Sequence, residues 1–553
     1  MFAFSFCVAI SAVAAAGPDT VIVSPPVFLE AMRPWISHRA TQGHTFAFVS
    51  NAGSAAQIRE AIRREAKLGN VRFVLLVGDA EPSAVNDPLV RARSIPAFMA
   101  DARVNVRWRS TPELPTDNWY ADLDDDGVPD LAVGRIPADT PEELAMIVHR
   151  IIQYETAGWP GDWRQRVNFV AGIGGFGPLL DPIVEIATKK FLTDGIPSAY
   201  RTTMTYASWR SPFCPNPYEF HDKTVQRFNE GCLFWVYIGH GYPYQLDRVR
   251  VPDGSHHILS VADMPRLDNR NGIPIAVFLA CYAGAYDQPY DCLAEEMLRS
   301  PGGPAAVLAG SRVTMPYAMA VLGSGLLHEC FSKRTLTLGE IVLNAKRQLA
   351  DDTTKCTRRK LLDLLGKAVS PTPNLLKQER LEHILLFNLF GDPLMRMPYP
   401  ESIELEVADR ATAGTFLEVR GTSPVSGTGI VELVFPRDKL RHDPPPRHRY
   451  EDSPQVLHGF NIAYQEANNR CWSHRRVAVV DGHLLTALEI PTETRGYCHV
   501  RAFLQDDAGR RYALGSRDIQ ITSPRTASSP VRASVKDSRR AKTATLPAVG
   551  VPR

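Results

Sequence analysis

A histidine and a cysteine each follow an uninterrupted apolar run. His240 comes shortly after CLFWVYI, which ends at Ile238, and Cys281 comes directly after IPIAVFLA, which ends at Ala280. If the two runs are neighbouring strands of a parallel sheet, both side chains emerge at the same edge, where sites in such sheets form. A thiol is a nucleophile and an imidazole transfers protons, so this pair predicts nucleophilic catalysis. An isolated cysteine is commonly a packing residue, and the pattern alone leaves both interpretations open.

Glycines flank both of these residues. Gly239 and Gly241 surround the histidine, and Gly284 follows the cysteine. Glycine allows positive φ and a close approach of the backbone to a ligand, so amide groups at these loops can face a developing oxyanion.

A second motif is acidic. Four aspartates are spaced like the oxygen ligands of a calcium loop: Asp122, Asp124, Asp126 and Asp130. Gly127 permits the sharp turn of such a loop, although Val133 stands where the usual glutamate would be. The alternative is a solvated acidic turn. We predict structural calcium, because four carboxylates this close repel one another unless they are neutralised.

A third motif, Gly172–Gly177, fits the GxGxxG pattern of dinucleotide-binding proteins. Pro178 and Pro182 interrupt the position where the phosphate-binding helix would start. An exported dinucleotide-binding oxidoreductase is therefore only a minor alternative.

Strands and helices that alternate along the first 400 residues must position these motifs. A first α/β unit is expected over residues 17–158 and a second over 159–399, each with short apolar runs that favour a parallel sheet covered on both faces. The expected strands are Val21–Val23, Phe46–Val49, Val71–Val77, Val167–Ala171, Leu233–Ile238, Ile273–Ala280 and Ala305–Ala309. The fold class is α/β.

The remaining sequence has a different pattern. Residues 400–522 alternate apolar and polar side chains between turn residues, which predicts a β-sandwich. Within it, Cys471 and Cys498 are the expected disulfide partners if any cysteines pair. Residues 523–553 contain few large apolar side chains and are expected to be disordered.

Composition restricts the class of protein. The chain has 553 residues, enough for about three or four folding units. Its 62 Lys and Arg balance 60 Asp and Glu, which argues against nucleic acid as a partner.

Residues 1–16 are apolar and too short for a comfortable membrane span, so we predict a signal peptide, export, and no stable membrane span after its removal.

The ordered pair of runs ending in His-Gly and Ala-Cys resembles the signature of the caspase-like cysteine peptidases of clan CD. From about Pro18 to Pro400 the chain looks like the gingipain-type cysteine peptidases, through DNWYADLDDDGVPDLAVGRIP, the His240 and Cys281 segments, GPAAVLAGSR, TLGEIVLNAK and FNLFGDPLM. The resemblance implies two α/β subdomains with a caspase-like parallel-sheet catalytic core, followed by an immunoglobulin-like β-domain. It also implies Cys281 as the nucleophile, His240 as proton donor to the leaving amine, and the amides of Gly241 and Cys281 as the oxyanion site.

The same resemblance assigns a substrate pocket. Its wall would include Ile238, Leu279 and Tyr317, and Asp181 is the nearest equivalent of the acidic residue at the pocket base. Such a carboxylate would favour Arg or Lys at the cleaved bond. Alternatively, Asp181 caps the helix that starts at Pro182. The chain departs from the family in lacking an acidic residue between Ile173 and Gly177, which leaves a third catalytic residue undetermined.

These observations predict an exported cysteine endopeptidase with a Cys-His dyad and a thioester acyl-enzyme. Its partners would be polypeptide substrates, and its location would be secreted, periplasmic or at the cell surface. Since the first unit begins near Gly17, we expect no large propeptide. The alternatives are a non-catalytic cell-surface or secretion-associated protein that retains the fold, and a thiol acyltransferase that is not a peptidase.

Overall fold

The computed structural model describes residues 17–173, 195–353, 356–370, 372–442 and 444–523. The predicted signal peptide (1–16), Asp181 and residues 524–553 of the predicted tail lie outside these described residues, as does most of the Gly172–Gly177 motif.

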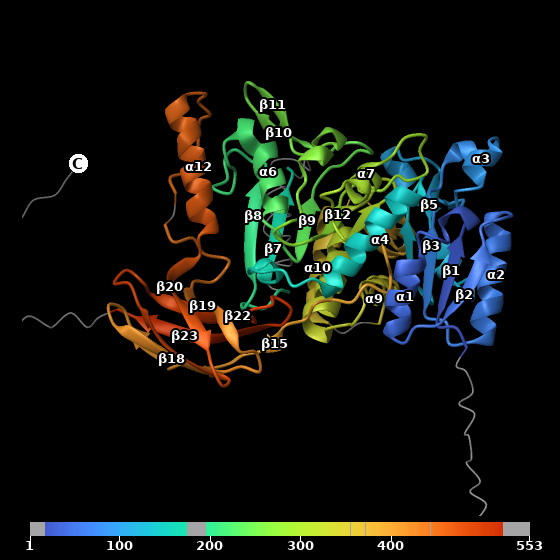
Figure 1. Ribbon diagram of the computed structural model, residues 1–553. Helices are drawn as coiled ribbons and strands as arrows, with labels where there is room; N and C mark the ends of the chain where they lie inside the picture. The colour runs from blue at the N-terminus through green and yellow to red at the C-terminus, as the bar shows by residue number, and fades with distance from the viewer. Residues whose placement is uncertain (1–16, 174–194, 354–355, 371, 443, 524–553) are drawn as a thin grey trace, which may run out of the picture.

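Both α/β units contribute strands to one ten-stranded sheet (Figure 1). The predicted strands are confirmed, and the sheet adds three that the apolar runs did not indicate, β6, β8 and β14. In spatial order the strands are β2 (Phe46–Ser50), β1 (Thr20–Ser24), β3 (Phe73–Val77), β6 (Ala132–Ile136), β14 (Phe387–Phe390), β13 (Ala306–Gly310), β12 (Ile275–Leu279), β9 (Phe234–Ile238), β7 (Arg166–Ala171) and β8 (Arg201–Tyr206).

The two halves of this sheet meet at β14. All neighbouring strands are parallel except β13 and β14, which pair antiparallel over four residues. On its other side β14 contacts β6 through the single pair of Phe390 and Arg135. The loop after β14 adds a buried anchor, because Asp392 accepts hydrogen bonds from Trp35 at 2.5 Å and from Nε of Arg39 at 3.0 Å. A strand from late in the chain therefore joins the halves.

Helices cover both faces of the sheet, as the uniformly apolar strands predict. The α-helices among the described residues of this part are α1 (Arg33–Thr41), α2 (Ala55–Leu68), α3 (Pro88–Arg91), α4 (Pro141–Thr156), α6 (Phe220–Asn229), α7 (Leu293–Arg299), α8 (Pro316–Leu327), α9 (Leu338–Ala350), α10 (Thr357–Val369) and α11 (Leu376–Leu386). Alternate residues of one strand point to opposite faces, so Val21 and Val23 share a core with α2, whereas Ile22 lies in the core that contains α1 and α4.

Helix α4 shows how the sequence fixes these boundaries. The hydroxyl of its N-cap, Thr140, accepts a hydrogen bond from the Glu143 amide at 3.2 Å, and Pro141 occupies the first turn. The carboxylate of Glu143 accepts from the Asp139 amide rather than from the Thr140 amide. The two hydrogen bonds resemble a capping box in which the second bond goes to the residue before the N-cap.

Residues after 400 form two sheets with a shared core. The larger consists of β15 (Glu401–Ser402), β23 (Tyr512–Thr522), β22 (Gly496–Gln505), β19 (Gly427–Val434) and β20 (Cys471–Val479), with β17 (Arg410–Thr412) beside β23. The smaller consists of β16 (Glu404–Glu406), β18 (Phe416–Thr422) and β21 (His483–Glu489). In β18 buried and exposed residues alternate, and the buried ones meet the larger sheet. This β-domain has the predicted sandwich form; its immunoglobulin-like character stays a prediction.

The expected pairing of Cys471 with Cys498 is wrong, since both thiols are free. Cys471 lies on β20 and Cys498 on β22, and β19 runs between these strands. Two strand spacings amount to about 10 Å, whereas disulfide-bonded Cα atoms lie within about 7 Å of each other.

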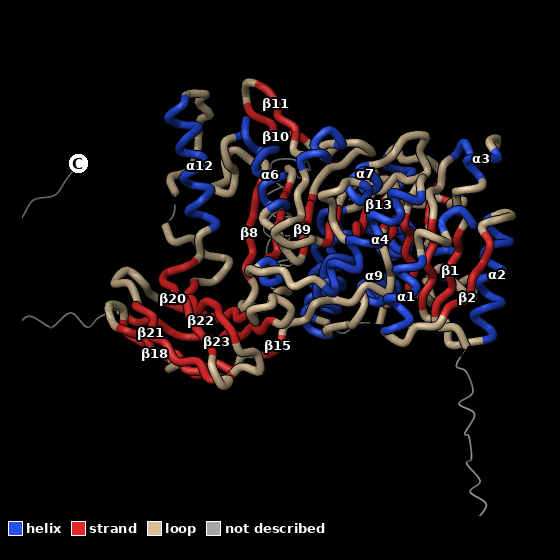
Figure 2. Tube along the Cα trace, viewed as in Figure 1, coloured by secondary structure: helices blue, strands red, loops and turns tan. Residues whose placement is uncertain are grey.

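One helix of the β-domain leaves the sandwich. Helix α12 (Pro454–Asn468) connects β19 to β20 and runs beside β8, the edge strand of the large sheet (Figures 1 and 2). The Tyr464 hydroxyl lies 2.7 Å from that of Thr205, and Asn468 accepts a hydrogen bond from the Met204 amide at 2.8 Å. The β-domain is thus held against the open edge of the sheet. In the described segments no helix is both long and apolar enough to cross a bilayer.

Candidate active site

The residues that carry the predicted chemistry follow two adjacent strands. Strands β9 and β12 are parallel neighbours (Figure 1). Their register pairs Ile238 with Leu279. His240 and Cys281 each stand two residues beyond this pair. The two strands therefore deliver the imidazole-bearing loop and the thiol-bearing loop to the same edge of the sheet.

The two loops are in direct contact at Gly241. A Cβ atom at this position would lie 2.5 Å from the carbonyl oxygen of Cys281 and 3.1 Å from the side chain of Ala280. Glycine is the residue that permits this approach, because any side chain would push the loops apart.

The backbone of the histidine loop is fixed from two sides. The carbonyl oxygen of His240 accepts a hydrogen bond from the Tyr237 hydroxyl at 2.8 Å and another from the Asp247 amide at 3.1 Å. Tyr237 and Asp247 are both buried. The position of His240 therefore depends on the core beneath it.

The thiol of Cys281 lies against Thr314, in the segment that leads into α8. The Thr314 amide donates to Sγ at 3.3 Å, and Sγ lies 3.6 Å from the Thr314 hydroxyl and 3.7 Å from its carbonyl oxygen. Burial raises the pKa of the Cys281 thiol, and the bonds to Thr314 lower it by less. A thiol in this state needs a proton acceptor to become a nucleophile.

The turn that follows the cysteine is strained. Tyr282 has a φ of 57°, a left-handed conformation that is rare for a bulky residue. Its amide donates to the carbonyl oxygen of Arg312 at 3.2 Å, and the Arg312 guanidinium in turn forms an ion pair with Asp287. Strained residues of this kind concentrate at functional sites.

The amides of Gly241 and Cys281 were predicted to form the oxyanion site. Among the hydrogen bonds between described residues, neither amide donates to a protein oxygen. Their role as oxyanion donors stays a prediction.

Two residues that the sequence analysis missed hold the first turn of α8. Nε2 of His383 accepts a hydrogen bond from the Met315 amide at 2.7 Å, and its Nδ1 faces the carbonyl oxygen of Glu379 at 2.7 Å. The Glu379 carboxyl accepts from the Ala318 amide at 3.1 Å. Burial lowers the pKa of His383 to about 4 and raises that of Glu379 to about 7.

This arrangement fixes the segment that contacts Cys281. Because His383 is neutral, it can accept from the amide of the residue next to Thr314. The signal available in the sequence was a Glu and a His one helical turn apart in QERLEHILLFN, directly before the apolar run ILLF.

The predicted pocket residues have different environments. Ile238 is partly exposed, whereas Leu279 and Tyr317 are buried. The Tyr317 hydroxyl donates to Asp363 at 2.5 Å and accepts from Arg380 at 2.9 Å. The structure thus brings Ile238 and Leu279 together on paired strands, and their role as a substrate wall stays a prediction.

The acidic loop gathers three of its four predicted ligands. Asp122, Asp124 and Asp130 each offer an oxygen, and these oxygens lie within 4.8 Å of one another. Asp126 instead accepts a hydrogen bond from the Val128 amide at 2.7 Å. Burial raises the pKa of Asp122.

Two arginines already reach this acidic loop. Arg59 lies 3.5 Å from Asp122 and 2.6 Å from Asp125, and Arg63 lies 2.9 Å from Asp125. They supply part of the neutralisation that the sequence analysis attributed to calcium.

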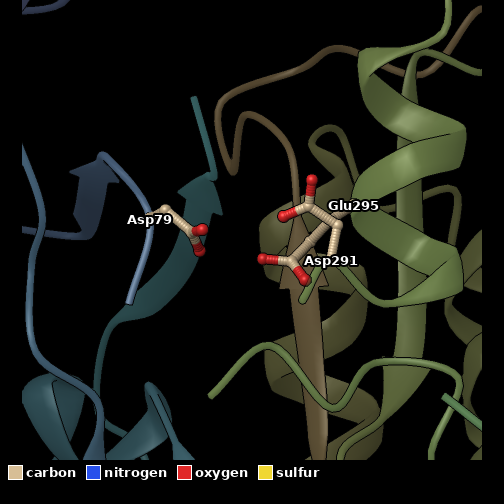
Figure 3. A group of neighbouring side chains, drawn as sticks. All are labelled: Asp79, Asp291 and Glu295. Atoms are coloured by element: carbon tan, nitrogen blue, oxygen red, sulfur yellow. The ribbon is translucent and has the colours of Figure 1, made fainter. Parts of the chain in front are cut away.

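A separate acidic group joins the halves of the sheet. Asp79, after β3, faces Asp291 and Glu295 at the start of α7 (Figure 3). Arg299 offsets part of the charge of the group, because its guanidinium lies 3.2 Å from Asp79 and 2.7 Å from Asp291. Burial and the charge of Asp79 raise the pKa of Glu295 well above its usual value. The group links the loop after β3, in one half of the sheet, to the start of α7, in the other half.

Comparison with known proteins identifies relatives of this chain. A family model described as peptidase family C25 matches residues 14–398. Lys-gingipain HG66 of Porphyromonas gingivalis is 22% identical over 291 residues, which are 50% of this chain and 15% of the relative. The chain thus corresponds to a small part of that curated relative.

Solved structures show the same fold. The crystal structure of the Arg-specific cysteine proteinase gingipain R aligns with a TM-score of 0.52 at 17% identity, covering 92% of this chain and 98% of that one. The complex of the pro- and mature domains of Porphyromonas gingivalis RgpB aligns with a TM-score of 0.51 at 17% identity, covering 91% and 100%. The predicted architecture, a caspase-like α/β core followed by a β-domain, is confirmed.

Proposed function

Because the chain belongs to peptidase family C25, we propose that it is an exported cysteine endopeptidase that uses Cys281 and His240. The observation that carries the proposal is the register of β9 and β12, which pairs Ile238 with Leu279 and so brings the loops of His240 and Cys281 to one edge.

The reaction has two stages. In acylation, the Cys281 sulfur attacks the carbonyl carbon of a peptide bond, and the thiol proton is passed through His240 to the departing amine. The carbon–nitrogen bond breaks and a thioester remains on Cys281. In deacylation, water attacks the thioester, a carboxylic acid is released, and the thiol is restored. His240 carries the protons in both stages.

The amides of Gly241 and Cys281 would stabilise the negative charge on the carbonyl oxygen during both attacks. Support comes from the contact between the two loops, which brings the Gly241 backbone against that of Cys281. Fixed amide donors aimed at a developing oxyanion are worth about 3 to 4 kcal/mol each in related chemistry.

Substrate selection would depend on Ile238, Leu279 and Tyr317 together with Asp181 at the base. The relatives named above include a Lys-gingipain and an Arg-specific proteinase, which favours a basic side chain before the cleaved bond. The competing role of Asp181 is to cap the following helix. Substrate profiling separates the two roles.

The substrates would be polypeptides outside the cytoplasm, in the secreted, periplasmic or cell-surface compartment. The apolar segment at residues 1–16 supports export. The balanced charge of the chain gives no support for nucleic acid.

We also propose calcium as a structural ligand of the loop from Asp122 to Asp130. The three clustered carboxylates support it, and the loop provides the oxygen atoms that calcium prefers. Asp126 is the weakest of the predicted ligands, because it lies outside the cluster of the other three carboxylates.

The principal alternative is a non-catalytic cell-surface or secretion-associated protein with the same fold. The presence of both Cys281 and His240 favours the enzyme. Family membership argues against the oxidoreductase, and a thiol acyltransferase would give ligated products instead of hydrolysed ones.

The decisive experiment incubates the purified chain with a peptide library, with and without iodoacetamide, and identifies the products by mass spectrometry. Thiol-dependent cleavage in the parent, lost in Cys281→Ala, is the expected result. Intact peptides in every sample would favour the non-catalytic alternative.

A further inference from the structure

A large cavity lies between the catalytic unit and the β-domain, away from the Cys281 edge. It has a volume of about 720 Å³, and its walls come from β7 and β8 on one side and from β19, β20 and β22 on the other. This volume is in the range of sites for small molecules.

The charge of the cavity is unbalanced. Among the described residues that line it, six arginines face three carboxylates. The buried Glu432 is shared, since its Oε1 lies 2.9 Å from Arg201 and its Oε2 lies 2.7 Å from Arg501. Glu432 thus lies between two guanidinium groups from opposite sides of the cavity, and Arg201 also forms an ion pair with Asp162.

Arg470 has still less compensation. Its Nη1 donates to the carbonyl oxygens of Pro436 at 3.0 Å and Lys439 at 3.2 Å, and its buried Nε has no hydrogen-bond partner. In the parts of the chain that the structure describes, no carboxylate lies within ion-pair distance of its guanidinium. Burial lowers the pKa of Arg470 to about 10, which still leaves it charged at neutral pH.

Buried cations without counterions are costly, and an anion in the cavity would remove that cost. The guanidinium group presents its donors in a planar fork that matches phosphate, sulfate and carboxylate groups. We propose that this cavity binds a small polyanion that carries such groups, with Arg201 contributed by the catalytic unit and Arg470 and Arg501 by the β-domain. A ligand held from both sides would stabilise the contact between the two.

The test measures binding and does not depend on peptidase activity. Full-length protein carrying Cys281→Ala, which prevents self-cleavage, is titrated calorimetrically with pyrophosphate and with citrate at constant ionic strength. Saturable binding is expected, and the stronger probe distinguishes a phosphate ligand from a carboxylate ligand. Absence of saturable binding of both probes would overturn the proposal.

Variants locate the site. Arg470→Gln should weaken binding at least tenfold. Arg470→Lys should weaken binding less, because lysine keeps the positive charge, although it lacks the planar, forked donors of the guanidinium group. The matched control is Arg475→Gln, which removes an exposed arginine from β20, the strand that directly follows Arg470. Equal losses in Arg475→Gln and Arg470→Gln would show general charge attraction and refute the site.

A second measurement uses the chain with its arginines intact, in case Arg470→Gln does not fold. Cys471 lines the cavity and is partly exposed. Pyrophosphate or citrate should slow its alkylation by N-ethylmaleimide at least threefold and leave that of the exposed Cys356 unchanged. Equal rates with and without either anion would contradict the proposal.

Discussion

The Cα atom of Gly241 faces the carbonyl oxygen of Cys281 so closely that a methyl group on it would lie 2.5 Å from that oxygen. Gly241→Ala should therefore separate the two loops and lower kcat/KM by about 100-fold, the effect of misplacing reacting groups by about 1 Å. The free energy of unfolding should fall by only about 1 to 3 kcal/mol. Peptide hydrolysis and thermal denaturation measure the two effects.

The control for this variant is Gly254→Ala, in the hairpin of β10 (Arg248–Val251) and β11 (Gly254–His257), where an added methyl group meets nothing within 4 Å. It should retain activity and stability. Parental activity in Gly241→Ala would show that the close contact has no part in catalysis.

Cys281→Ala should abolish turnover and His240→Ala should reduce it by about 10²- to 10⁴-fold, the usual contribution of acid–base catalysis. Both should fold.

Cys292→Ala should stay active and lose about 1 kcal/mol of stability, because Cys292 is fully buried beside α7. Alkylation mapped by mass spectrometry should find Cys281 and spare Cys292; the reverse pattern would refute the assignment.

His383 should make stability depend on pH. Burial lowers its pKa to about 4 in the folded protein, whereas the unfolded value is about 6.5. Between these values the unfolded chain binds more protons, so this contribution is complete above pH 6.5 and is lost as pH falls to 4. The advantage of the parent over His383→Gln in unfolding free energy should shrink by on the order of 3 kcal/mol across this range.

Comparison with His383→Gln is needed because Glu379, with a pKa raised to about 7, changes stability in the opposite direction. Denaturant unfolding at pH 7.5, 5.5 and 4.5 supplies the data. A difference between the two proteins that does not vary with pH would contradict the role given to His383.

Millimolar calcium should raise the thermal midpoint of the parent relative to chelator, because a ligand that binds only the folded state stabilises it. Asp124→Asn should remove this effect, since Asp124 belongs to the carboxylate cluster. Asp126→Asn should preserve it. An identical melting curve of the parent in calcium and in chelator would refute the proposed calcium site.

Asp181→Asn tests the predicted pocket. If Asp181 lies at its base, the parent should prefer Arg or Lys before the cleaved bond and the variant should lose that preference, because a neutral amide offers no charge-assisted contact. Cleavage-site profiling of both proteins measures it. A basic preference that survives in the variant assigns Asp181 to helix capping.

Local patterns in the sequence were sufficient for much of the fold. The apolar runs that end at Ile238 and Ala280 correspond to β9 and β12, and the structure meets the condition that the two strands be neighbours. The pairing of Cys471 with Cys498 failed because strand order in the β-domain is a non-local property, and β19 separates the two cysteines.

The sequence contains little indication of the residues and strands that hold the candidate site in position. His383 lies 102 positions after Cys281 and acts through Met315, so no spacing rule connects them. The shared sheet depends likewise on β14, a strand of four residues that contacts β6 at one pair. A short strand or a single residue whose partners lie far away in the sequence produces little periodicity in the pattern of apolar residues.

The position of β14 has a consequence for synthesis of the chain. Strands β6 and β13 are both made before residues 387–390 leave the ribosome, and until then each is an unpaired sheet edge. The central sheet can be completed only after about 70% of the 553 residues have been translated. A nascent chain, or one truncated before Phe387, would expose two unpaired strand edges. Because other chains can pair with such edges, we expect chaperones to bind this protein during its synthesis.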